Sequence, residues 1–152
     1  MRCDMKLRVV LIAAASVLLA ADDPKDAAKK EMEKLQGTWV LIASEREGEK
    51  VPEDAFKEEK ITLTIAGDKL SFSRTRKGEK RNFDNGSYEI VDAGAKPKMI
   101  DLTGFPKPDV KMLGIYELDG NTLKICVGES KRPTEFASKP GSKTGVLVLR
   151  TE

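Results

Sequence analysis

The spacing of apolar residues predicts one helix near the start of the chain. Between residues 22 and 35, Ala28, Met32 and Leu35 recur at i, i+4 and i+7, and charged residues occupy the other faces. This spacing is typical of an amphipathic surface helix. Asp23 stands where its side chain would cap the first free amides. Beyond this helix the apolar period changes to two, which is the period of β-strands.

Alternating apolar and polar residues predict roughly seven or eight strands at short, regular intervals. The clearest hairpin turns at Asp119-Gly120-Asn121, whose residues tolerate positive φ angles. A second hairpin turns at Gly67-Asp68, and we interpret the basic segment 74–81, with Gly78 at its centre, as a solvated hairpin. The expected strands cover residues 38–43, 61–65, 70–73, 87–91, 98–103, 112–118, 122–127 and 145–150.

This order of elements predicts an all-β fold, because strands follow one another without the βαβ alternation of a parallel sheet. The first strand, 38–43, and the last, 145–150, are apolar on both faces. Pairing of these two strands would close a barrel and remove exposed edges. We therefore expect a helix over residues 22–35 and one antiparallel barrel domain over residues 36–152.

The first residues have the layout of a secretory signal peptide. Arg2, Lys6 and Arg8 precede an apolar run over residues 9–19, and Ala20-Ala21 follows it. A bilayer span needs about 20 apolar residues, so this run is too short for a membrane anchor. We expect a signal peptide over residues 1–21, a periplasmic or secreted protein, and no membrane span after cleavage. Initiation at Met5 would fit the pattern equally well.

The charge balance gives the domain no general attraction for polyanions. The chain has 27 basic and 25 acidic residues, and loss of residues 1–21 would leave 24 of each. A neutral domain has little long-range attraction for nucleic acid, so we expect no nucleic-acid partner. The basic segment 74–81 also lacks the alternating aromatic residues of a single-strand binding groove.

The residue inventory argues against catalysis. The chain contains no His, which removes Ser-His-Asp and Cys-His schemes and most zinc sites. Cys126 would be the single cysteine after export, and its apolar neighbours predict a buried thiol. We expect no catalytic residues, no cofactor and no metal, and hence no enzyme.

Three carboxylates adjoin apolar strands and are acid–base candidates: Asp101, Glu117 and Glu135. Carboxylates in such settings can have raised pKa values. Hydrolysis by two of them would need a separation of about 5 to 10 Å. For Glu117 the preferred interpretation is a surface charge opposite Lys124 across the hairpin at Asp119-Gly120-Asn121.

The segment Gln36-Gly37-Thr38-Trp39 resembles the start of the lipocalin-like superfamily, whose first strand carries a Gly-x-Trp motif. In that superfamily an Arg of the last strand packs on the Trp ring. The resemblance implies that Arg150 stacks on Trp39 as a structural pair, with a cation–π attraction between guanidinium and indole.

Four further segments resemble a family of small exported proteins, the Planctomycetes uncharacterised domain. They are residues 96–103, 114–120, 132–136 and 138–142. The resemblance implies an exported lipocalin-like domain, and it carries no activity to particular residues.

Two hypotheses about function follow. The first is a carrier that binds a small apolar molecule in the barrel cavity. The alternative is a protein-interaction or envelope-structural module, with an envelope protein as its partner and a barrel filled by its own side chains. Arg132, Glu135 and Phe136 lie in one extended loop, which is a candidate ligand or partner loop. The simpler interpretation is a loop pinned over the barrel end.

Overall fold

The computed structural model describes residues 23–152. The predicted signal peptide and its cleavage site therefore lie outside the described residues. The elements are α1 (Pro24–Leu35), β1 (Gly37–Arg46), β2 (Glu49–Val51), α2 (Ala55–Glu58), β3 (Glu59–Ala66), β4 (Lys69–Arg76), β5 (Glu79–Asp92), β6 (Lys98–Thr103), β7 (Lys111–Asp119), β8 (Thr122–Gly128) and β9 (Thr144–Thr151).

Helix α1 begins as its sequence predicts. The backbone N–H of Lys25 donates to Asp23 Oδ1 at 3.0 Å, and Pro24 occupies the first helical position. The helix buries Glu31 and Leu35, with Ala28 and Met32 packed against the core beside them. One face of the helix is thereby fixed against the barrel, and its basic side chains stay in solvent.

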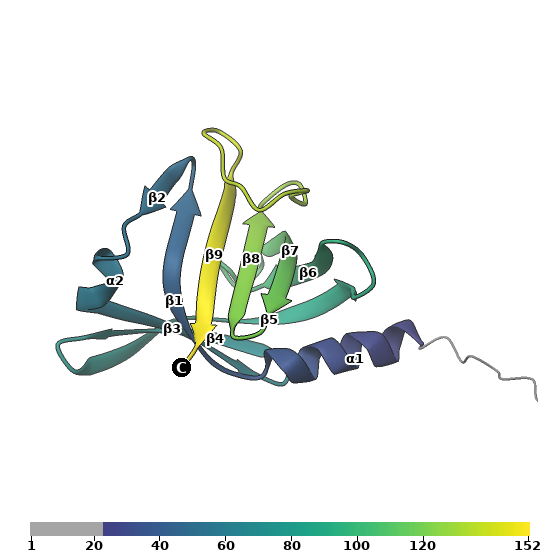
Figure 1. Ribbon diagram of the computed structural model, residues 1–152, viewed down its shortest axis with the longest axis horizontal. Helices are drawn as coiled ribbons and strands as arrows, with labels where there is room; N and C mark the ends of the chain where they lie inside the picture. Colours follow the sequence, from purple (N-terminus) through teal and green to yellow (C-terminus); the bar gives the residue numbers. More distant parts are fainter. Residues whose placement is uncertain (1–22) are drawn as a thin grey trace, which may run out of the picture.

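The strands form a closed antiparallel barrel, which confirms the predicted fold class (Figure 1). Strand β1 pairs with β3 on one side and with β9 on the other, so the first and last strands close the barrel as expected. Eight strands, β1 and β3 to β9, make up the wall. The short β2 pairs with β1 alone and extends one end of it.

Two segments are more regular than the sequence pattern predicted. Residues 45–50, expected as a charged connection, form the hairpin between β1 and β2. Strand β5 runs from Glu79 to Asp92 in one piece, through Asn85-Gly86. It pairs with β4 around the turn at Lys77-Gly78, which confirms a hairpin in the basic segment. Both faces of the β4–β5 hairpin are polar near its tip, so the hydropathy of this segment does not show the period of two that marks a strand.

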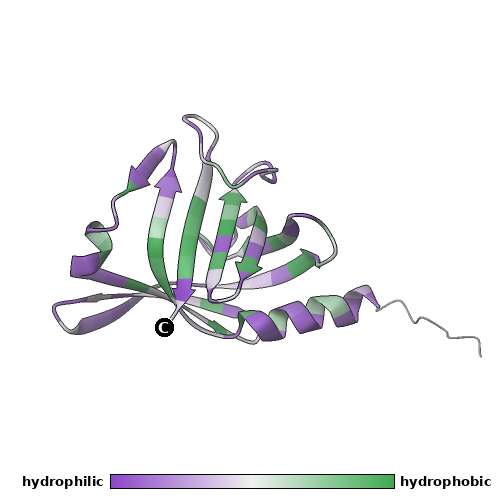
Figure 2. Cartoon of the chain, in the orientation of Figure 1, coloured by the Kyte–Doolittle hydropathy of each residue, from purple (hydrophilic) through white to green (hydrophobic). Residues whose placement is uncertain are grey.

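Side chains alternate between the barrel interior and its outer face. The interior is filled at the end that α1 covers, where Leu63, Leu123 and Leu149 are completely buried. Figure 2 shows apolar residues along β1, β8 and β9. A smaller apolar cluster of Ile115, Cys126 and Val146, joined by Phe136, lies on the outer face. The expectation of a buried Cys126 is confirmed.

The end covered by α1, here called the closed end, also holds a buried ionic cluster. Lys34 and Lys98 each place Nζ 2.9 Å from the Glu31 carboxylate, and the Tyr116 hydroxyl donates to Glu31 Oε2 at 3.1 Å. Burial alone raises the pKa of the Glu31 carboxyl. The three hydrogen bonds outweigh this effect, so its pKa lies below the ordinary value. The cluster ties α1 to β6 and β7.

Within residues 23–152, neither helix has the length and apolar character needed to cross a membrane.

Candidate ligand-binding site

The opposite end of the barrel, here called the mouth, contains a cavity of about 290 Å³. Its apolar wall is built from inner-facing side chains of five strands and one loop. These residues are Phe72 of β4, Leu102 of β6, Phe105 of the following loop, Met112 of β7, Val127 of β8 and Leu147 of β9. In the closed end the same strands supply fully buried residues, so the mouth is the part of the interior that is left open.

Two glycines shape this mouth. A Cβ atom at Gly86 would lie 2.3 Å from the carbonyl oxygen of Thr103 and 2.4 Å from the Phe105 ring. Only glycine therefore lets Phe105 fold in against β5, where its ring meets Phe72 edge-on at 5.5 Å. A Cβ at Gly145 would meet no atom nearer than 3.9 Å. The space beside Gly145 is part of the cavity.

Charged side chains surround the cavity at its rim. Asp84 and Glu129 contribute two carboxylates, and Arg46 and Lys143 contribute two cations. An apolar floor with a polar rim is the usual arrangement of a small-molecule site. The charges of these four side chains balance at the entrance.

The structure does not bring the predicted pair of Trp39 and Arg150 together. Trp39 is only 2 % exposed and lies inside the closed end, where its indole N–H donates to the carbonyl oxygen of Leu35 at 2.9 Å. Arg150 pairs in register with Val40, the neighbour of Trp39, so its side chain lies on the outer face and is exposed. Among the described residues, the cation–π contacts are Arg74 with Phe83 and Lys124 with Phe136.

The candidate loop is pinned against the outer wall of the barrel. The Arg132 guanidinium donates to the carbonyl oxygens of Gly114 at 2.7 Å and Ile100 at 3.2 Å, and its second nitrogen lies 2.8 Å from Asp101 Oδ1. Lys111 Nζ approaches Asp101 Oδ2 at 3.0 Å. Arg132 therefore fastens the loop to β6 and β7, and it satisfies the buried carboxylate of Asp101.

The other two loop residues point elsewhere. Glu135 is 65 % exposed in its side chain and pairs with Lys139 at 3.3 Å. Phe136 packs on the outer apolar cluster, with Lys124 Nζ 5.5 Å from its ring centroid. Arg132 and Glu135 line one hollow, whereas Phe136 does not, so the three residues do not share a pocket. The loop is pinned, as the simpler interpretation expected, but against the outer wall and not over the barrel end.

Asp101 and Glu117 lie too far apart along the barrel wall to act as an acid–base pair. Asp101 stands opposite Leu113 in the β6–β7 ladder, and Glu117 lies four residues farther along β7. At about 3.3 Å per residue these positions are separated by ~13 Å, beyond the 5 to 10 Å range that hydrolysis requires. Glu117 lies opposite Lys124, as the hairpin pattern predicted. Among residues 23–152 no group of three or more Cys, Asp or Glu side chains is placed to hold a metal ion.

Sequence reasoning did not find the mouth. Phe72, Met112 and Val127 have the same alternating pattern as residues of the filled end, so hydropathy alone does not separate a lining residue from a core residue. The one available signal was Gly145 at an inner-facing position of the last strand, since a missing side chain there leaves volume unfilled.

Comparison with known proteins adds no relationship: no family model matches the chain, and a search of curated proteins finds no match. The family resemblance of the four segments above therefore stays a prediction.

Proposed function

We propose that this protein is a non-enzymatic, exported domain of lipocalin-like build that binds a small apolar molecule in the mouth of its barrel. The observation that carries the proposal is the cavity of about 290 Å³, whose apolar walls come from the barrel interior. Apolar surface that a fold leaves open inside a concave site gains free energy when a ligand covers it.

The size of the cavity limits the ligand. Sites for drug-sized molecules measure roughly 300 to 1,000 Å³, and this mouth lies at the lower edge of that range. The closed end offers no additional room, because Leu63, Leu123 and Leu149 are fully buried there. The ligand is therefore small, or only its apolar part enters the barrel.

The filled closed end favours a second candidate function. A barrel that is packed over much of its interior suits a protein-interaction or envelope-structural module, in which the outer surface carries the function. In that case the mouth would be a shallow depression without a specific ligand.

Titration of the purified protein with N-phenyl-1-naphthylamine separates the two candidates. This neutral probe is weakly fluorescent in water and bright in apolar surroundings. We expect saturable binding with one probe per chain, confirmed by native mass spectrometry. Trp39 is a poor reporter, since it lies in the closed end and not in the mouth.

Two variants of β9 locate the bound probe. Gly145→Phe directs a ring into the mouth from a position where a Cβ meets no atom nearer than 3.9 Å, and we expect it to weaken probe binding at least ten-fold. Val148→Phe adds a ring to the opposite face of the same strand, since residue 148 alternates with the inner-facing Leu147, and it should leave binding unchanged. Absence of saturable binding to the unmodified protein, or equal binding to both variants, would overturn the carrier proposal in favour of the second candidate.

A further inference from the structure

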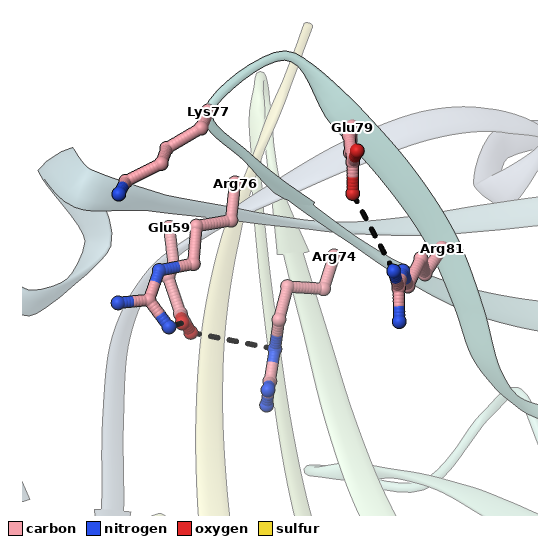
Figure 3. A pocket seen from close by; sticks show the side chains of 6 residues that line it. All are labelled: Glu59, Arg74, Arg76, Lys77, Glu79 and Arg81. Carbon is pink, nitrogen blue, oxygen red and sulfur yellow. Dashed lines mark hydrogen bonds and ion pairs between the residues drawn. The ribbon is translucent and has the colours of Figure 1, made fainter.

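The β4–β5 hairpin projects beyond the barrel wall on the side away from α1 (Figure 1). Together with Glu59 of β3, the hairpin side chains Arg74, Arg76, Lys77, Glu79 and Arg81 line a hollow of about 610 Å³. Four cations and two carboxylates give this hollow a formal charge of +2. Figure 3 shows Arg74 beside Glu59 and Arg81 beside Glu79 on the neighbouring strand. We call this hollow the arginine hollow.

The arginine hollow continues the wall of the mouth. Phe72, Arg74 and Arg76 alternate along β4 and therefore share one face. Phe72 lines the mouth, and the two arginines line the hollow. At about 3.4 Å per residue, Arg74 and Arg76 lie ~7 and ~14 Å along the strand from Phe72. One molecule can therefore contact both places.

The exposed aromatic ring of Phe83 lies between the mouth and the arginine hollow. Phe83 is 48 % exposed, which is unusual for a large apolar side chain in this fold. Its ring centroid lies 6.0 Å from that of Phe72 and 5.5 Å from the guanidinium carbon of Arg74. Phe105, Phe72 and Phe83 thus form a continuous apolar track that leads from the cavity to the arginines.

The arginines are incompletely neutralised. Arg74 and Arg81 stand directly opposite each other across the β4–β5 ladder, a placement in which like charges repel. Glu59 serves both Arg74, at 3.3 Å, and Arg76, at 3.6 Å, and Glu79 lies 3.4 Å from Arg81. A bound anion would relieve this repulsion. The charged side chains at the rim of the mouth balance, whereas the arginine hollow has a formal charge of +2, so an anionic group is favoured at the hairpin over the cavity entrance.

We infer that the ligand is an anionic amphiphile, whose apolar part fills the mouth and whose head group binds the arginine hollow. The inference rests on the proposed function and deepens it. Carboxylate, sulfate and phosphate heads share the required chemistry, because guanidinium groups bind all three with charge-assisted hydrogen bonds. The competition experiment described below ranks the affinities of these three head groups.

A matched pair of probes tests the charge of the head group. 8-Anilinonaphthalene-1-sulfonate is N-phenyl-1-naphthylamine with an added sulfonate. The ratio of the two affinities isolates the contribution of the anion, because changes in the shared apolar site cancel. We expect the sulfonate probe to bind at least ten-fold more tightly at low salt. The ratio should fall at 0.5 M NaCl, since exposed charges are screened there.

Two double variants test whether the preference for the sulfonate probe arises at the arginine hollow. Arg74→Gln/Arg81→Gln should reduce the affinity ratio at least five-fold, while Lys29→Gln/Arg150→Gln, which removes two exposed charges at the closed end, should leave it unchanged. Competition by decanoate, decyl sulfate and decyl phosphate then ranks the head groups, with decyltrimethylammonium as the cationic counterpart. A ratio near one, or equal effects of the two double variants, would overturn the anionic head site. If the neutral probe still binds in that case, the proposed carrier function stands; if it does not, that function has failed separately.

Discussion

The closed end and the mouth are the two ends of one eight-stranded barrel, but they differ in how their interiors are filled. In the closed end, α1 covers the barrel, Trp39 and Tyr116 fill it, and Glu31 is held by Lys34, Lys98 and the Tyr116 hydroxyl. In the mouth, Phe72, Met112, Val127 and Leu147 line an open cavity. The closed end is therefore the stabilising half of the molecule, and the mouth is where apolar surface is available to a ligand.

The closed end and the mouth also differ in how they accommodate polar side chains. Among residues 23–152, no buried side-chain nitrogen or oxygen lacks a hydrogen-bond partner. The closed end can bury a carboxylate because three donors surround it. The mouth instead keeps its charges at the rim, where water solvates them. Substitutions should accordingly affect stability at the closed end and binding at the mouth.

The largest effect is expected from Trp39→Ala, which removes a nearly fully buried ring from the closed end. We expect a loss of about 3 to 5 kcal/mol in the free energy of unfolding. The comparison is Leu147→Ala in the mouth, for which the expected loss is about 1 to 2 kcal/mol, since that side chain is half-buried. Urea unfolding measures both. Equal losses would contradict the division into two ends.

Glu31→Gln should cost about 1 to 3 kcal/mol at neutral pH, because hydrogen bonds to a charged carboxylate are lost. The pKa of Glu31 is lowered in the folded protein. Its ionised form therefore stabilises the fold above the unfolded pKa, and this contribution disappears as the pH falls through the folded pKa. The difference between the native protein and Glu31→Gln should shrink from pH 7 to pH 3 in urea unfolding. A constant difference over that range would exclude the ionised carboxylate as its cause.

A pair of glycine substitutions tests the packing of the mouth. Gly86→Ala brings a Cβ within 2.3 Å of the Thr103 carbonyl oxygen, and we expect a loss of about 1 to 3 kcal/mol from overpacking. Gly145→Ala adds the same methyl group to the open cavity, and thermal unfolding should detect a change of at most about 0.5 kcal/mol. A larger loss for Gly145→Ala would show that the space beside it is already filled.

The smallest expected effect concerns Trp39 and Arg150. Since the two side chains lie on opposite faces of the sheet, their alanine substitutions should be additive within about 0.5 kcal/mol in a double-mutant cycle. A coupling of 1 kcal/mol or more would indicate that Arg150 stacks on the indole in solution.

Much of the architecture was predictable from local patterns. Asp23-Pro24 and the stripe of Ala28, Met32 and Leu35 specify α1, since capping and amphipathic spacing are local properties. The turn at Asp119-Gly120-Asn121 and the period of two specify β7 and β8. The two-sided first and last strands predicted barrel closure, which the β1–β9 ladder confirms.

The candidate site depended on tertiary structure. The inner position of Phe83 results from a bulge in the β4–β5 ladder, and the opposition of Arg74 and Arg81 results from the register of the same hairpin. Neither follows from hydropathy, because the hairpin tip is polar on both faces. Arg132 is an example of a residue that the sequence did single out. Its charge and its position in a loop suggested a ligand contact, but in the structure it binds two backbone carbonyls and Asp101.

By itself, the sequence determined the class of fold and the order of its elements, because helix caps, turn residues and alternating hydropathy act over a few neighbouring residues. The tertiary structure decided which half of the barrel is filled and which is open. That outcome depends on how side chains from distant strands share one interior volume, with Gly145 leaving space in the mouth and Trp39 filling the closed end.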